Sequence, residues 1–174
     1  NTAQLYRWDR LDYLERLQKK AEENKFKIGV KLVRGAYMEK ERNRAQEMGY
    51  PSPIQPDKKS TDRDYDLALE YCVENSIAVC AGTHNEASSL LLVNLITNKN
   101  LDKTNKDFYF AQLLGMSDHI SFNLSKQGYN VAKYVPYGPV KDVIPYLIRR
   151  AEENTSVAGQ TSRELSLISS EIKR

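Results

Sequence analysis

Short apolar runs alternate with longer amphipathic runs along this sequence, and that alternation constrains the fold more than any other feature. Four runs have the length and composition of buried strands. They are Ile28–Val33, Ile77–Gly82, Phe108–Leu113 and Val131–Val135. A helical run separates each strand from the next, so successive strands are expected to run parallel, with the helices crossing back over the sheet. The pattern predicts an α/β fold.

The spacing of apolar residues predicts the helices. In the first helical run, Leu11, Leu14, Leu17 and Ala21 recur at three- and four-residue intervals, which places one apolar stripe toward a sheet. Thr61 follows a proline-containing loop and is predicted to cap the helix that begins at Asp62. The expected helices are Trp8–Asn24, Met38–Met48, Asp62–Glu74, Glu86–Thr97, Ser117–Gln127, Pro139–Asn154 and Ser162–Lys173.

The composition is that of one ordinary globular domain over residues 1–174. Of the 174 residues, 40% are apolar, and 26 Lys and Arg against 23 Asp and Glu give a formal net charge of +3. That charge is too small and too dispersed to indicate a nucleic-acid partner. Cys72 and Cys80 fit neither a disulfide framework nor a redox or zinc motif, which favours a reducing compartment and two buried thiols.

Membrane and metal signals are both weak. No apolar run reaches the roughly 20 residues that a membrane-spanning helix needs, and residues 1–10 lack the apolar core of a signal peptide. The sequence therefore predicts a protein that does not span a membrane, and peripheral contact with one stays open. With two histidines and two dispersed cysteines, no metal site is expected.

Chemically functional residues gather in the last residues of the predicted strands and directly after them, at the carboxyl ends where parallel α/β folds carry their sites. The segments are Lys31–Tyr37, Thr83–Asn85, Gln112–Met116 and Lys133–Gly138. Lys31 lies on the opposite strand face from Val30 and Leu32. It is predicted either to point into a barrel or, on an edge strand, to reach out to water. For Thr83–Asn85, a ligand site and a plain helix cap by Asn85 both stay open.

Two adjacent arginines in the penultimate helix form the strongest candidate for a binding site. Tyr146, Arg149, Arg150 and Glu153 fall at i, i+3, i+4 and i+7, so they share one side of the helix. Two guanidinium groups directed together can grip one carboxylate, with Glu153 orienting an arginine. The alternative is a solvated pair with an ordinary surface interaction between Arg149 and Glu153. Spacing alone leaves both interpretations open.

Taken together and in this order, the motifs resemble the flavin-dependent proline dehydrogenases. The resemblance is carried by KLVRGAY (Lys31–Tyr37), THN (Thr83–Asn85), QLLGM (Gln112–Met116), YVPYG (Tyr134–Gly138), YLIRRAEEN (Tyr146–Asn154) and REL (Arg163–Leu165). It implies a (β/α)8 TIM-type barrel that holds FAD at the carboxyl ends of its strands. A full barrel takes about 250 residues. This chain is therefore expected to start just after a fourth strand and to carry about strands 5 to 8 with their helices plus a C-terminal helix.

The resemblance also implies a role for each motif residue. Lys31 would be the catalytic cation beside flavin N5. The implied cofactor-binding residues are Gln4, Lys31, Arg34, Gly35, Ala36, Thr83 and His84. The implied substrate-binding residues are Arg149 and Arg150 for the carboxylate, Tyr37, Leu113, Tyr134 and Tyr146 around the ring, and Glu153 in support of the arginines.

The implied reaction is oxidation of L-proline to Δ1-pyrroline-5-carboxylate, with hydride passing from ring C5 to flavin N5 and electrons continuing to a quinone-type acceptor. The resemblance implies a cytoplasmic enzyme, peripheral at the inner membrane, or a mitochondrial one in a eukaryote, and a homo-oligomer is compatible with it. Two other classes stay open. One is a non-catalytic half-barrel that self-associates or binds carboxylates, and the other is a barrel lyase or aldolase in which Lys31 forms a Schiff base.

Overall fold

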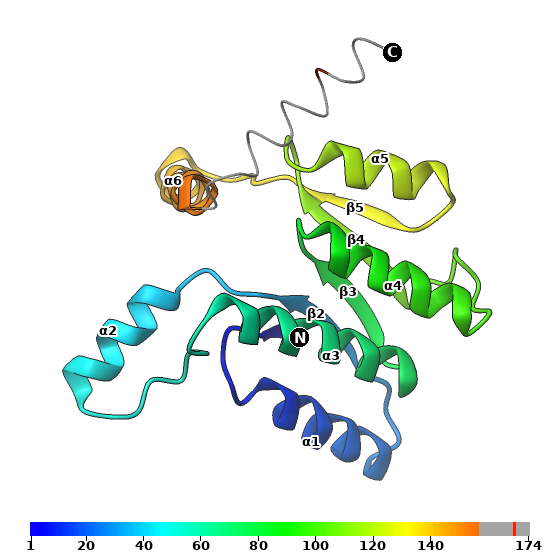
Figure 1. Ribbon diagram of the computed structural model, residues 1–174, viewed down its shortest axis with the longest axis horizontal. Coiled ribbons are helices and arrows are strands. Elements are labelled where there is room, and N and C mark those ends of the chain that lie inside the picture. The colour runs from blue at the N-terminus through cyan, green and yellow to red at the C-terminus, as the bar shows by residue number, and fades with distance from the viewer. Residues whose placement is uncertain (157–168, 170–174) are drawn as a thin grey trace. The chain divides into compact units, whose positions relative to one another are not determined.

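Five parallel strands form one sheet, in the order in which they occur along the chain (Figure 1). They are β1 (Thr2–Gln4), β2 (Gly29–Val33), β3 (Ala78–Gly82), β4 (Phe108–Leu113) and β5 (Val131–Tyr134). The computed structural model describes residues 1–156 and Ser169, without the side chains of Arg149 and of residues 151–156. The chain divides into two units, Asn1–Val135 and Pro136–Arg174, and each is described by itself.

The four predicted strands are confirmed to within one residue at each end, and the structure adds a fifth at the N-terminus. The expectation that the chain starts after a strand is wrong, because Thr2–Gln4 pairs with β2, with Ala3 opposite Leu32. Three residues are too short a run to show any periodicity. Only the pairing with β2 makes this segment a strand.

Five helices connect the strands in the first unit. They are α1 (Arg10–Glu23), α2 (Met38–Met48), α3 (Lys58–Glu74), α4 (Glu86–Asn98) and α5 (Asp118–Lys126). The prediction that Thr61 caps the third helix is wrong. The N-cap is Asp57, whose backbone is extended. Its carboxylate accepts a hydrogen bond from the Ser60 N–H at 2.7 Å, in the first turn of the helix. Thr61 lies inside α3 and donates its hydroxyl to the Asp57 carbonyl.

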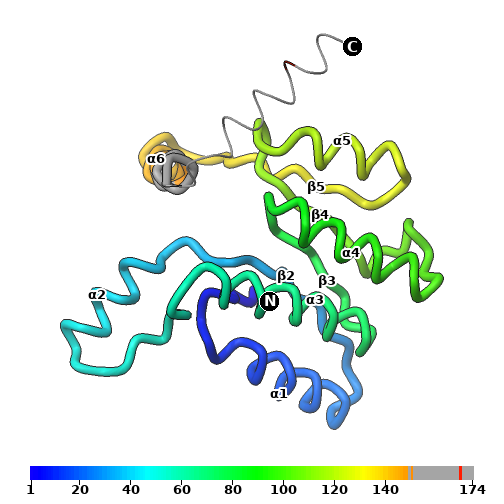
Figure 2. The backbone as a smooth tube through the Cα atoms, viewed as in Figure 1, coloured from blue at the N-terminus to red at the C-terminus, as the bar shows by residue number. Residues whose placement is uncertain are grey.

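The core is an apolar layer between the helices and one face of the sheet. Val30 and Leu32 of β2 are buried in it, together with Tyr65 of α3 and Leu92 of α4. Figures 1 and 2 show α1, α3, α4 and α5 following the same side of the sheet. Because successive side chains in a strand point to opposite faces, Lys31 projects from the other face, as the sequence predicts.

The strand order identifies the fold class. A doubly wound sheet reverses its strand order and is covered on both faces, whereas sequential parallel strands with helices along one face form the arc of a β/α barrel. The predicted α/β class with a parallel sheet is confirmed. The numbering of the four predicted strands, β2 to β5, as strands 5 to 8 of an eight-stranded barrel stays a prediction. Within the described residues, β1 and β5 are the two edges of the sheet.

The second unit contains α6 (Val140–Ser156), which confirms the helix predicted over Pro139–Asn154. The predicted helix Ser162–Lys173, apart from residue 169, and the REL motif lie outside the described residues. Among the residues that the structure describes, no helix combines the length and the apolar character needed to cross a bilayer.

Candidate active site

The face of the sheet opposite the helices brings together residues from strands that are far apart in the sequence. Lys31 of β2 extends its ammonium group to within 5.5 Å of the centre of the Tyr134 ring on β5. Neighbouring strands lie about 4.8 Å apart, so β2 and β5 would be separated by about 14 Å in a flat sheet. The two side chains meet because both project from the same, concave face. The structure thus joins two of the predicted site residues.

A row of small residues lies beside Lys31 on this concave face. Gly82 of β3 pairs with Ala111 of β4, which pairs with Ala132 of β5. A Cβ atom on Gly82 would lie 3.1 Å from Cε of Lys31, closer than the ordinary carbon contact of about 3.5 to 4.0 Å. The lysine side chain therefore lies directly over the glycine. The three small residues project little above the backbone, which suits the approach of a flat group.

The two cysteines occupy different environments. Cys72 of α3 is buried in the apolar core, as predicted, and burial raises the pKa of its thiol to about 12. Cys80 of β3 is half-buried and pairs with Lys31 on the concave face. Burial raises the pKa of the Cys80 thiol, and the Lys31 ammonium opposes that rise only in part. Both thiols are therefore protonated near pH 7 and are poor nucleophiles.

Gly35 follows β2 in a conformation that favours glycine. Its φ is +125°, and a Cβ atom there would lie 1.8 Å from Cδ1 of Tyr6. The buried Tyr6 ring therefore lies against the Gly35 backbone, and its hydroxyl donates to Oε1 of Gln4 at 3.0 Å. Burial raises the pKa of Tyr6, so the hydroxyl keeps its proton. Two predicted cofactor residues, Gln4 and Gly35, are thus connected by a tyrosine that the sequence did not single out.

Each residue of the segment after β3 has a defined partner. Asn85 caps α4, as predicted: its side chain accepts a hydrogen bond from the Ser88 N–H at 3.1 Å. Nδ1 of His84 lies 3.0 Å from the hydroxyl of Ser117, which precedes α5. Thr83 is buried. The capping role of Asn85 is confirmed, and a ligand-binding role for Thr83 and His84 stays a prediction.

Arg34 turns its side chain away from the concave face. The alternation along β2 continues past the strand end, so Arg34 shares the helix-covered face with Leu32. Its guanidinium group hydrogen-bonds to Asp62 of α3, to Thr83 and to Ser88 of α4. Asp62 and Ser88 are site-supporting residues that no motif indicated.

The segment after β4 is fastened by two buried or half-buried polar side chains. The Gln112 amide donates to the Thr83 carbonyl at 3.1 Å, which ties the ends of β3 and β4 together. Lys133 of β5 donates to the Met116 carbonyl at 2.8 Å and to the Asp118 carboxylate at 2.6 Å. These contacts fix the turn between β4 and α5.

The residues predicted to surround the substrate ring are only partly gathered in the first unit. Leu113 ends β4 and pairs with Tyr134 of β5, so both project from the concave face near Lys31. Tyr37 directly precedes α2 and is exposed. The positions of Leu113 and Tyr134 agree with a shared wall, and the role of Tyr37 stays a prediction.

In the second unit, Arg150 lies beside Tyr146 on α6. The guanidinium carbon is 5.3 Å from the centre of the tyrosine ring, which confirms the shared helix side predicted for this pair. The side chains of Arg149 and Glu153 lie outside the description. The carboxylate site predicted for the arginine pair stays a prediction.

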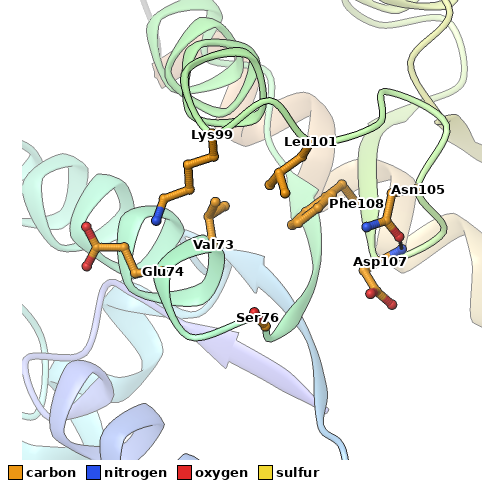
Figure 3. A pocket seen from close by; sticks show the side chains of 8 residues that line it. All are labelled: Val73, Glu74, Ser76, Lys99, Leu101, Asn105, Asp107 and Phe108. Carbon is orange, nitrogen blue, oxygen red and sulfur yellow. Dashed lines mark hydrogen bonds between the residues drawn. The ribbon is translucent and has the colours of Figure 1, made fainter.

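A separate pocket of about 400 Å³ lies at the other end of the sheet (Figure 3). Ser76 precedes β3 and Phe108 begins β4, so the pocket opens at the amino ends of these strands. Its lining residues are Val73, Glu74, Ser76, Lys99, Leu101, Asn105, Asp107 and Phe108. None of the predicted site residues lines it, and it does not belong to the candidate site.

Known proteins resemble this chain over most of its length. A family model described as Proline dehydrogenase matches residues 1–163. Proline dehydrogenase 1, mitochondrial, from Dictyostelium discoideum is 40% identical over 183 residues, covering 100% of this chain and 32% of that protein. Hydroxyproline dehydrogenase from Xenopus laevis is 43% identical over 153 residues, covering 84% of this chain and 33% of that protein.

A solved structure agrees with these sequence matches. Proline utilization A (PutA) from Bdellovibrio bacteriovorus has a TM-score of 0.84 to this chain at 29% sequence identity, covering 90% of this chain and 16% of that one. The chain spans about a third of the length of the two relatives matched by sequence.

Proposed function

Because this chain belongs to the proline dehydrogenase family, we propose that it forms part of an enzyme that oxidises L-proline to Δ1-pyrroline-5-carboxylate. The observation that carries the proposal is the meeting of Lys31, in the middle of β2, with Tyr134, at the carboxyl end of β5, on the concave face. A cation beside an aromatic wall can hold an electron-rich flat group and a small ring together. The remaining active-site groups are expected elsewhere in the full-length protein.

We infer that the cofactor is FAD, bound against the concave face. Two features of the chain fit a flat ring system: the small residues Gly82, Ala111 and Ala132, and the glycine conformation at Gly35. The residues that would hold the cofactor, either by direct contact or by positioning the backbone that contacts it, are Gln4, Lys31, Arg34, Gly35, Ala36, Thr83 and His84. When bound, FAD supplies the acceptor for the hydride from proline C5. The Lys31 ammonium would favour added negative charge beside it.

We also infer that Arg149 and Arg150 bind the proline carboxylate, with Glu153 in support. The support for this is the spacing of the pair, because two neighbouring guanidinium groups can grip one carboxylate, and the position of Arg150 beside the Tyr146 ring. Tyr37, Leu113, Tyr134 and Tyr146 would surround the ring. Holding both ends of a small rigid substrate is how such a site brings the reacting carbon into position.

One absorbance spectrum tests the proposal. The purified full-length protein is expected to show the two visible bands of an oxidised flavin, and L-proline added without oxygen is expected to bleach them. A colourless protein would overturn the proposal and favour a non-catalytic half-barrel that binds carboxylates. Since one relative is named hydroxyproline dehydrogenase, the same titration with 4-hydroxyproline distinguishes the two substrates.

Replacing Arg150 with Met tests the carboxylate site in the full-length enzyme. Each lost charge-assisted hydrogen bond is worth about 1.5 to 3 kcal/mol, so the KM for proline is expected to rise roughly 10- to 150-fold with the flavin still bound. Arg16→Met is the matched control, because Arg16 is exposed and interacts with Asp12 one turn earlier on α1. An unchanged KM in Arg150→Met would remove the carboxylate assignment.

The edges of the sheet carry a further expectation. Within the part of the chain that the structure describes, β1 and β5 are the edges of the sheet, and edge strands present unpaired backbone groups. The 174-residue piece alone is therefore expected to bind FAD poorly, and co-expression with the rest of the domain is expected to restore binding. A tight, stoichiometric flavin in the isolated piece would contradict this.

We propose a quinone-type electron acceptor, and with it a position peripheral to the inner membrane, mitochondrial in a eukaryote. A homo-oligomer is compatible with that arrangement. Proline-dependent reduction of a soluble quinone by the purified full-length enzyme would support the acceptor, and reduction of oxygen alone would contradict it.

A further inference from the structure

We propose that Arg34 and Thr83 are positioning residues: their side chains clamp the carboxyl ends of β2 and β3 to α3 and α4, and do not themselves contact the cofactor. The inference rests on the proposed function and refines it, since both residues belong to the motifs expected to bind FAD. The consequence is that the cofactor is met by the neighbouring positions Gly35, Ala36 and His84.

The contacts of Arg34 engage all three nitrogens of its guanidinium group. Nε lies 2.5 Å from Oδ1 of Asp62, Nη1 lies 2.7 Å from Oγ1 of Thr83, and Nη2 lies 2.9 Å from Oγ of Ser88. The flat face of the group lies 4.3 Å from the centre of the buried Tyr65 ring. Only 22% of the Arg34 side chain is exposed. A guanidinium with one acceptor on each nitrogen and an aromatic ring on one face is held in a single orientation.

The hydroxyl of Thr83 is also engaged inside the protein. It accepts hydrogen bonds from Nη1 of Arg34 at 2.7 Å and from the Asn85 N–H at 3.0 Å. A hydroxyl has two acceptor lone pairs, so these two bonds use its whole accepting capacity. Thr83 is only 6% exposed, so its side chain faces the protein interior and not a ligand.

The clamp extends from one helix to the next. The Ser88 hydroxyl on α4 accepts a hydrogen bond from Arg34 and donates one to Oδ1 of Asp66 on α3 at 2.6 Å. The Asp62 carboxylate on α3 forms an ion pair with Arg34 and a second one with Lys58, one turn earlier on the same helix. Both strand ends are therefore fixed to the same pair of helices by charged and hydroxyl groups.

The strand alternation explains why the clamp and the site lie on opposite sides of the same backbone. Arg34 and Thr83 fall on the helix-covered face, whereas Gly35 and His84, one residue further along, fall on the concave face. The backbone stays paired at these positions, since the Tyr6 N–H donates to the Arg34 carbonyl at 2.7 Å. Fixing one side of each strand end therefore fixes the position of the residue that faces the cofactor.

Asp62→Asn in the full-length protein separates the clamp from direct cofactor binding, because the two predict opposite signs. If Arg34 bound a cofactor phosphate, removal of its carboxylate partner would leave its positive charge uncompensated and would tighten FAD binding or leave it unchanged. If Arg34 is a clamp, FAD is expected to bind about tenfold more weakly, within the range of coupling between residues in one network. Asp12→Asn, which breaks an exposed ion pair on α1, is the control.

The measurement is the FAD dissociation constant of folded apoprotein, from quenching of flavin fluorescence, at a temperature where far-UV circular dichroism shows each variant folded. A role in folding alone would lower the unfolding midpoint and leave this constant unchanged, which overturns the proposal, as does tighter binding. If Asp62→Asn does not fold, Ser88→Ala removes one buried bond of the clamp and is expected to weaken FAD binding in the same direction. A wild-type protein that binds no FAD at all would overturn the proposed function instead. Failure of the clamp proposal and failure of the proposed function are therefore distinguishable.

Discussion

Replacing Gly35 with Ala is expected to be among the most disruptive single changes in the first unit. The added Cβ atom would lie 1.8 Å from Cδ1 of Tyr6, so the ring would have to retreat by about 1.7 Å to reach a normal contact of about 3.5 Å. Tyr6 cannot retreat easily, because it is buried and both its backbone N–H and its carbonyl are hydrogen-bonded at 2.7 Å, to Arg34 and Gln55. The ring and the new methyl group compete for the same space.

The cost has two parts. Forcing a side chain into a crowded interior costs about 1 to 3 kcal/mol, and holding a non-glycine residue at a φ of +125° costs of order 1 to 3 kcal/mol more. The free energy of unfolding is therefore expected to fall by about 2 to 6 kcal/mol. Since the Tyr6 hydroxyl holds Gln4, the variant is also expected to bind FAD more weakly.

Gly49→Ala is the matched control. Gly49 also has a positive φ, +71°, but a Cβ atom there would have no atom within 4 Å, so only the backbone cost of about 1 to 2 kcal/mol applies. Urea unfolding of the full-length protein, followed by circular dichroism, measures both variants. Equal losses in the two would refute the argument from the Tyr6 contact. A second test is Tyr6→Ala in the Gly35→Ala background, which should recover part of the loss by removing the clash.

Three other changes have expected outcomes. Phe110→Ala empties the space beside the Tyr129 ring and is expected to lower the free energy of unfolding by about 3 to 5 kcal/mol, measured by urea titration. Lys133→Met leaves the Met116 carbonyl without its donor at a cost of about 1 to 3 kcal/mol, and hydrogen exchange in residues 114–116 should rise relative to the rest of the sheet. Burial opposes ionisation of Asp62, but hydrogen bonds from its two cationic neighbours prevail and hold its pKa below the ordinary value. A carboxyl whose pKa is lowered on folding contributes stability above its unfolded pKa of about 3.9, and that contribution is lost as the pH falls through the folded pKa. The midpoint of thermal unfolding should therefore fall less between pH 5 and pH 3 in Asp62→Asn than in the wild type, and equal falls would contradict this.

Local pattern located the strands, most helices and the ends where the site residues lie, because a two-residue or 3.6-residue period depends only on neighbours along the chain. The two-residue alternation also predicts the orientation of Arg34 and Thr83, because both continue the pattern of the buried residues in their strands. The resemblance to the family assigned Arg34 and Thr83 to the cofactor. Continuing the alternation one residue past the end of each strand would have predicted that both side chains point toward the helices.

Two sequence predictions were wrong. One feature depends on a pairing partner that is distant in the sequence, and the other depends on a choice between two neighbouring residues that can both cap a helix. The strand at Thr2–Gln4 exists only through its pairing with β2. Asp57 and Thr61 are both capable helix caps, and the earlier residue took the role because its extended backbone directs the carboxylate at the Ser60 N–H.

By itself, then, the sequence determined the α/β class, the direction of each strand face and the membership in the family. Only the tertiary structure decided which residues meet: Lys31 with Tyr134, Tyr6 with Gly35, and the Arg34 guanidinium with α3 and α4. The physical reason is that each of these contacts depends on the curvature of the sheet and on the path of a helix crossing back over it. Both the curvature and the helix path are set by packing between segments that are distant in the sequence, and such packing produces no periodic pattern of residues along the chain.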